Sequence, residues 1–234
     1  MTLTQIITQL AGGMGRSLLI FTLTLVFSLP LGLSVTAGRM SKWAPLARIK
    51  GPLAHLGLSG FMPVRLATQF FISVMRGTPL MLQLMVVYYG PYYIFGLPIS
   101  LEYQFYAVII AFSINYAAYF AEIYRGGIES IDKGQWEAAQ VLGYSKLQTF
   151  FLIILPQVVR RILPSITNEV ITLIKDTSLA MVIAYAEMFT LAKRMVAAQG
   201  NILPYVAAAI FYYVFNMVVA LAMEKLEKRL DYYN

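Results

Sequence analysis

The sequence predicts an all-α membrane protein of about five transmembrane helices, with its N-terminus outside and its C-terminus in the cytoplasm. Hydrophobic residues make up 59% of the 234 residues and charged residues only 12%, whereas a soluble domain carries about 25% charged residues. Five apolar runs are long enough to cross a bilayer, and basic residues gather in alternate segments between them. We therefore expect a single transmembrane domain over 1–234.

Each apolar run is close to or above the roughly 20 residues that cross a hydrocarbon core. The predicted spans lie at about 17–38, 67–95, 102–124, 163–186 and 204–224. The first run exceeds the core of a signal peptide and has no basic residue before Gly15, so we expect it to be retained. Arg76-Gly77-Thr78-Pro79 interrupts the second run, which predicts that a short interfacial helix enters that span.

The net charge of +7 does not indicate a nucleic-acid partner, because the basic residues lie between the apolar runs. The segments between the runs form two alternating sets, and one set contains fourteen basic residues whereas the other contains three. By the positive-inside rule this places the segment around Glu137 in the cytoplasm. The segment at 39–66 contains three prolines and His55, the only histidine, and is predicted to be an irregular cytoplasmic loop. A lone loop histidine does not indicate a metal site.

A polar, helix-favouring segment at about 133–156 separates two apolar runs. Gly143 stands at a helix-breaking position, which predicts two short helices with a turn between them. Ala138, Ala139 and Leu142 would form a small apolar patch for close docking of a partner. Pro156 is expected to end the helix that re-enters the membrane. A purely lipid-bound helix would favour a wider apolar stripe and a basic face, whereas this one carries Glu137.

This segment resembles the EAA loop of ATP-binding cassette (ABC) importer permeases, in the spacing Glu137-Ala138-Ala139, Gly143 and Ile153-x-Leu155-Pro156. The wider chain, from about 17 to 229, looks like a permease of the polar amino acid family, which includes histidine, glutamine and arginine importers. The segment at 42–66 is longer than that family's usual connection. The further similar strings are Arg76-Gly77-Thr78-Pro79-Leu80, Glu122-Ile123-Tyr124-Arg125-Gly126-Gly127-Ile128, Lys133-Gly134-Gln135-Trp136-Glu137, Leu155-Pro156-Gln157, Asn168-Glu169 and Lys175-Asp176-Thr177-Ser178-Leu179.

The resemblance implies the five-helix, MetI-like permease core and a set of partners. These are two copies of an ABC ATPase, a second permease (the same chain or a paralogue), and an extracytoplasmic solute-binding protein. The Glu137–Pro156 loop would couple the ATPase to alternating access in a bacterial inner membrane. ATP and Mg would bind the ATPase, because no G-x-x-x-x-G-K-[ST] string occurs here. The chain itself is then expected to bind no cofactor and to be no enzyme.

Ionisable groups at bilayer depth are costly and usually face a cavity or a partner. Helix spacing places Asn115, Tyr119 and Glu122 on one face, and Glu169, Thr172 and Asp176 on another, with Lys175 on the neighbouring stripe. One interpretation is a translocation path that contacts the ammonium and carboxylate of an amino acid, cationic ones included. The other is internal ion pairing, Glu122 with Arg125 and Lys175 with Glu122 or Asp176.

Two other classes of function stay open at this point. An ion-coupled carrier or channel could use the membrane acids as its coupling site, but it leaves the Glu137 loop without a role. A membrane scaffold that recruits a soluble protein leaves these polar membrane residues without a role. The sequence specifies neither the amino acid nor whether the permease pairs with itself.

Overall fold

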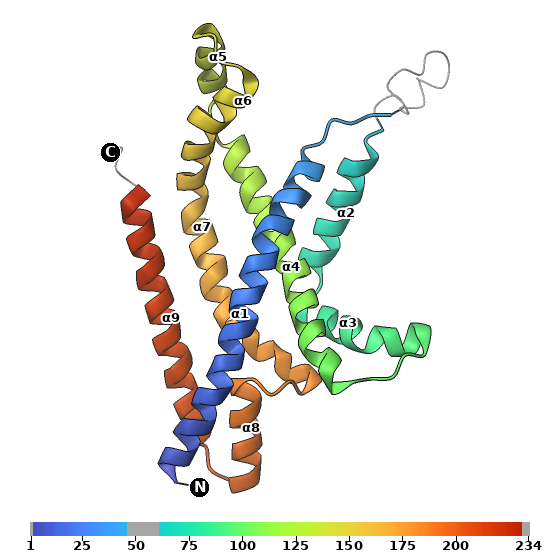
Figure 1. Ribbon diagram of the computed structural model, residues 1–234, viewed down its shortest axis with the longest axis vertical. Helices are drawn as coiled ribbons and strands as arrows, with labels where there is room; N and C mark the ends of the chain where they lie inside the picture. The colour runs from blue at the N-terminus through green and yellow to red at the C-terminus, as the bar shows by residue number, and fades with distance from the viewer. Residues whose placement is uncertain (1, 46–60, 231–234) are drawn as a thin grey trace.

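The computed structural model describes residues 2–45 and 61–230, and within them every regular element is a helix (Figure 1). His55 and most of the 42–66 segment lie outside the described residues. The elements in chain order are α1 (Leu3–Arg39), α2 (Pro63–Gly77), α3 (Leu80–Phe95), α4 (Leu101–Glu129), α5 (Lys133–Val141), α6 (Lys146–Gln148), η3 (Thr149–Ile154), α7 (Leu155–Asp176), η4 (Thr177–Ile183), α8 (Met188–Gln199) and α9 (Leu203–Leu230).

Four described helices are long and apolar enough to cross a membrane, or up to five if the bent pair α2–α3 is one span. This confirms the all-α membrane class. The helices α1, α4, α7 and α9 run along the long axis of the molecule (Figure 1). The short helices α5 and α6 lie at one end, and the N-terminus and α8 lie at the other. The helix α9 runs from the α8 end in the direction of the α5 end.

The contact between α1 and α4 is the most extensive between two helices. Small side chains on α1 allow it, because a Cβ at Gly32 would lie 2.9 Å from Phe120 Cβ. Thr36 Oγ1 also donates to the carbonyl of Ala121 at 3.1 Å. Such small residues let helix backbones approach closely in a membrane. The pair α1–α4 is therefore the central support of the fold.

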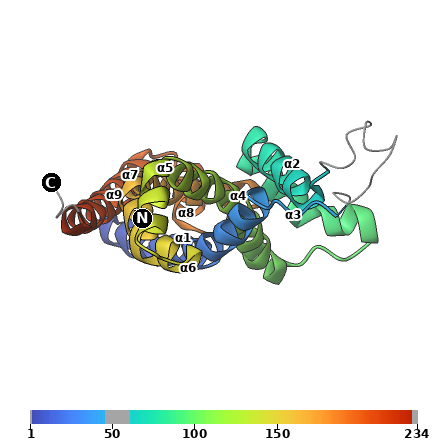
Figure 2. The same cartoon turned by 90° about the horizontal axis from the view of Figure 1, so that it is seen from above.

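The second apolar run does not form one straight span. It folds as α2 and α3, which are bent by 107° at a short break. The view from above shows both helices to one side of the long-helix bundle (Figure 2). The predicted interruption at 76–79 is present, but the two halves are nearly equal in length rather than a short entry helix and a span. The reason is that Pro79 cannot continue α2 and instead precedes the first residue of α3.

The prediction that Pro156 ends a helix is wrong. Pro156 is the second residue of α7 and directly follows the π-helical turn η3, so it lies inside a continuous helix, and the local change of winding occurs where proline removes a helical hydrogen bond. The helix is continuous from α6 through the π-helical turn η3 into α7. The predicted fourth span at 163–186 is therefore shifted, because α7 begins at Leu155 and gives way to the 3₁₀ turns of η4 after Asp176.

The sequence patterns did not predict α8. Its N-cap is Glu187, a fully buried carboxylate that accepts hydrogen bonds from the backbone N–H groups of Phe189 and Thr190, both at 2.6 Å. Ser17 of α1 and Tyr212 of α9 also donate to it, at 3.4 and 3.3 Å. This carboxylate thus joins three helices at the end that contains the N-terminus.

Candidate functional site: a polar cavity and an exposed helical loop

A polar cavity of about 540 Å³ lies between the α2–α3 bend, α4 and the end of α7. It brings together five of the seven residues predicted for the path: Asn115 and Tyr119 from α4, and Glu169, Thr172 and Asp176 from α7. The full lining is Arg76, Gly77, Thr78, Pro79, Leu80, Asn115, Tyr116, Tyr119, Glu169, Thr172, Asp176 and Leu179.

The acidic wall of the cavity comes from α7. Glu169, Thr172 and Asp176 follow the i, i+3, i+7 spacing, so they share one helix face and all line the cavity. The carboxylate of Asp176 accepts a hydrogen bond from the Tyr116 hydroxyl at 2.8 Å. Glu169 makes no hydrogen bond or ion pair with any residue in 2–45 or 61–230. Its carboxylate is therefore available to a ligand.

The basic group of the cavity is Arg76, which was not among the residues predicted for the path. Its guanidinium lies over the ring of Tyr119, 5.3 Å from the centroid, an arrangement that favours a cation. It shares the lining of this cavity with Glu169. A signal for it was present in the sequence, since Arg76 begins the interruption of an apolar run.

Glu122 and Lys175 do not line this cavity. Glu122 forms ion pairs with three arginines on three helices, Arg125 at 2.6 Å, Arg39 at 3.6 Å and Arg76 at 3.9 Å. For Glu122 the ion-pair interpretation is thus the one the structure favours. Lys175 lines a separate, mostly apolar cavity of about 520 Å³ with residues of α9 such as Tyr212, and it forms no ion pair with Glu122 or Asp176.

The loop around Glu137 has two helices with Gly143 at the turn, as predicted, but only α5 is short, because α6 continues through η3 into α7. Gly143 has φ of +81°, in the left-handed region that favours glycine. Asp132 caps α5 through the N–H of Gly134 at 2.6 Å. A capping box between Ser145 and Gln148 starts α6. The turn is therefore encoded locally.

The predicted docking patch is only partly correct. Ala139 is 1% exposed, because it packs inward and does not reach the surface. Glu137 and Ala138 are exposed, and Leu142 is 73% exposed. Val141, which is 87% exposed, and Leu147, which is 71% exposed, were not part of the predicted patch. The exposed aliphatic side chains of α5, α6 and the turn between them include Val141, Leu142 and Leu147, which we call the loop patch.

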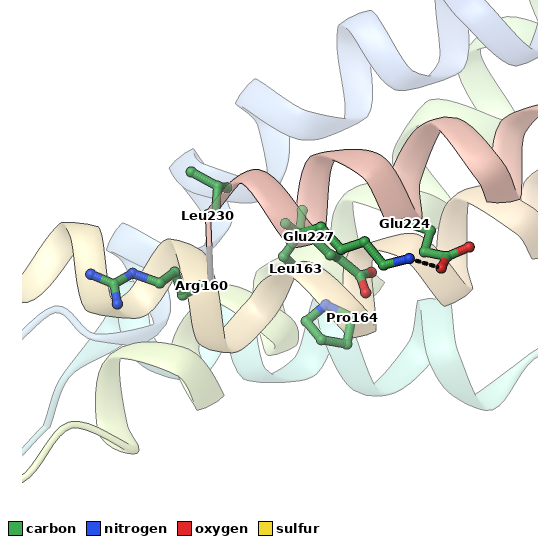
Figure 3. Close-up of a pocket in the computed structure, with 7 residues that line it drawn as sticks. Arg160, Leu163, Pro164, Glu224, Glu227 and Leu230 are labelled. Carbon is green, nitrogen blue, oxygen red and sulfur yellow. Dashed lines mark hydrogen bonds and ion pairs between the residues drawn. The ribbon is translucent and has the colours of Figure 1, made fainter. Parts of the chain in front are cut away.

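Another cavity of about 290 Å³ lies between α7 and α9, near the described end of the chain (Figure 3). Its charged groups interact within the fold: Lys228 donates to Glu224 at 2.5 Å, and Thr167 donates to Glu227 at 2.5 Å. Figure 3 shows Glu227 of α9 beside Leu163 and Pro164 of α7. We interpret this cavity as part of the helix contact.

Comparison with known proteins identifies the family of this chain. The model of the binding-protein-dependent transport system inner membrane component matches residues 54–232. The chain belongs to this family. Within it, the chain is similar to the L-cystine transport system permease protein TcyB of Bacillus subtilis, with 35% identity over 96% of this chain and 87% of that protein.

Two further permeases extend the comparison. The arginine transport system permease protein ArtQ of Bacillus subtilis is 39% identical over 85% of this chain and 90% of its own length. The glutamine transport system permease protein GlnP of Escherichia coli is 34% identical over 85% of this chain and 93% of its own. The chain is thus an ABC permease with amino acid permeases among its relatives.

Solved structures agree with the fold. The structure of an amino acid ABC transporter with histidines matches with a TM-score of 0.81 and 28% identity, covering 98% of this chain and 100% of that one. The inward-facing MetNI methionine ABC transporter matches with a TM-score of 0.68 and 14% identity, covering 98% and 99%, which shows the MetI-like fold alone. The permease is therefore an all-helical, multi-pass membrane protein of this fold.

Proposed function

We propose that this permease is the membrane subunit of an ATP-driven importer for a polar amino acid. One observation carries the proposal. The α6 half of the exposed loop and the acidic wall of the polar cavity belong to one continuous helical segment, because α6, η3 and α7 follow one another without a break. A partner that moves the loop would therefore move Glu169, Thr172 and Asp176.

The charges of the cavity support a zwitterionic ligand. Arg76 offers a cation on one side, and Glu169 and Asp176 offer carboxylates on the other. These groups complement the carboxylate and the ammonium of an amino acid. Because Glu169 has no partner within the described residues, a cationic amino acid is the finer proposal. The names of the cystine, arginine and glutamine permeases support the substrate class.

The proposed assembly follows from the loop and the charge pattern. The loop α5–α6 lies in the cytoplasm of a bacterium and contacts an ABC ATPase, present in two copies, which binds ATP and Mg. The N-terminus lies outside, where a solute-binding protein delivers the amino acid. A second permease, either this chain or a paralogue, completes the membrane part in the inner membrane. The excess of basic residues in the segments on the loop side supports this orientation.

The decisive experiment is a tagged pull-down from native membranes in mild detergent. We expect an ATPase with a P-loop at about one copy per permease, and the same gel distinguishes a homodimer from a heterodimer. Recovery of no ATPase, together with uptake that continues without one, would instead support an ion-coupled carrier. A stable soluble partner without uptake in any condition would support a scaffold.

Charge reversal at Glu137 tests the loop. Glu137 is exposed on α5, so Glu137→Lys should leave folding intact and abolish ATP-dependent uptake, because it reverses the charge of a side chain on the helix proposed to contact the ATPase. The measurement is uptake of labelled L-arginine, L-glutamine and L-cystine by cells that contain equal amounts of assembled permease. Lys133→Glu, a reversal at the start of the same helix, controls for charge alone. Wild-type uptake by Glu137→Lys would remove the loop from the mechanism.

A further inference from the structure

The break between α2 and α3 leaves backbone carbonyls without helical partners. Pro79 has no N–H to donate, and the chain turns by 107° between the two helices. Inside a bilayer no water can satisfy such groups, so protein must do so. Thr78 Oγ1 donates to the carbonyl of Val74 at 2.8 Å. The carbonyl of Met75, one residue before Arg76, accepts from two side-chain amides instead.

These two amides belong to Gln83 of α3 and Asn115 of α4, which we call the amide latch. Gln83 Nε2 donates to the carbonyls of Met75 and Thr78, at 2.9 and 3.1 Å, and to Thr78 Oγ1 at 2.8 Å. Asn115 Nδ2 donates to the carbonyl of Met75 at 3.1 Å and to Gln83 Oε1 at 3.0 Å. Every contact with the backbone uses an N–H group. A carboxylate of the same shape cannot make these contacts.

The latch bears directly on Arg76, which follows Met75 in the chain. The Arg76 side chain is 45% exposed. Its guanidinium lies over the Tyr119 ring and forms a long ion pair of 3.9 Å with Glu122. Such contacts at an exposed site are weak. Tyr119 lies one turn beyond Asn115 on the same face of α4. The amide latch thus fixes the backbone next to Arg76, and the Tyr119 ring that contacts the Arg76 guanidinium is one helical turn from Asn115.

We propose that Gln83 and Asn115 are positioning residues for transport, which hold the Arg76 guanidinium at the cavity wall, where it pairs with the carboxylate of the amino acid. This inference rests on the proposed function. Asn115 lines the cavity, but its side-chain amide donates to the carbonyl of Met75 and to Gln83. Its effect on binding therefore passes through Arg76.

The test measures binding to the detergent-solubilised permease–ATPase complex without the binding protein. The probes are L-arginine, L-glutamine and L-cystine, and the carboxamide of whichever binds. Arg76→Gln should weaken binding by about tenfold or more and abolish the preference for the free carboxylate over the carboxamide, because a charged hydrogen bond is lost. Gln83→Glu and Asn115→Asp should cause the same two losses while the ATPase still copurifies.

A double variant separates positioning from an independent role. Because the latch acts through Arg76, Gln83→Glu combined with Arg76→Gln should bind no more weakly than Arg76→Gln alone. Gln9→Glu, the same change on an exposed face of α1, should bind as the wild type does. Additive losses in the double variant, or a wild-type carboxylate preference in the latch variants, would overturn the proposal.

A second measurement tests the latch without any ligand. The chain contains no cysteine, so Ser73→Cys on α2 and Tyr93→Cys on α3 can each take a spin label at an exposed position. Gln83→Leu should broaden the distance distribution between the labels, and an unchanged distribution would overturn the latch. If the wild-type complex binds none of the three amino acids, the proposed substrate class and the proposed role of Arg76 are both wrong. The distance between the spin labels still tests whether the amide latch holds α2 against α3.

Discussion

Replacing Gly143 by valine is expected to uncouple the permease from the ATPase proposed as its partner. Gly143 has φ of +81° between α5 and α6, and its neighbour Tyr144 donates its N–H to the carbonyl of Ala139 at 3.0 Å. A β-branched residue is strained there by about 1–3 kcal/mol. The turn should therefore open, and the residues of the loop patch on either side of it should move apart. We expect the affinity for the ATPase to fall by about tenfold or more.

The measurement is recovery of the ATPase with tagged permease across a detergent-solubilised titration. Gly143→Asn is the matched control, because asparagine adopts the left-handed region far more readily than valine. It should retain most of the recovery. If Gly143→Val recovers the ATPase as well as the wild type does, the turn has no part in docking.

Replacing Gly13 by leucine is expected to cause a large loss of stability at the opposite end of the molecule. A Cβ at Gly13 would lie 2.7 Å from the Cα of Met188, and backbone atoms cannot rotate away as a side chain can. Helix α8 would have to separate from α1, which disrupts the hydrogen bonds around Glu187. We expect a loss of about 3 kcal/mol, at the upper end of ordinary overpacking.

Thermal unfolding in detergent measures this loss, and the chain supplies an adjacent control. A Cβ at Gly12 meets nothing within 4 Å, so Gly12→Leu should unfold close to the wild-type temperature. Gly13→Ala, which adds only the Cβ, should fall between the two. Equal unfolding temperatures for Gly12→Leu and Gly13→Leu would contradict the close contact of α1 with α8.

Some features of the site could be predicted because their causes are local. Pro79 and Gly143 restrict or extend the backbone at their own positions, so the break in the second span and the turn in the loop were visible in the sequence. Helix periodicity likewise placed Glu169 and Asp176 on one face. These predictions needed no knowledge of what packs against the helix.

Other features depend on contacts that no local pattern contains. Pro156 is compatible both with the end of a helix and with a place inside a continuous one, and only the continuity through η3 distinguishes them. Lys175 and Asp176 are adjacent in the chain but line different cavities, because α7 lies between the two cavities. Arg76 enters the site only through the bend of α2 relative to α3.

The unbroken path from α6 through η3 to α7 has a mechanical consequence. A helical rod from Lys146 to Asp176 is about 45 Å long. Its loop end lies outside the bundle, while its far end carries Asp176. A tilt of only a few degrees about its middle would displace each end by an ångström or more, in opposite directions. The rod would then act as a lever whose fulcrum is the contact of α7 with α4, where Gly127 meets Ile162.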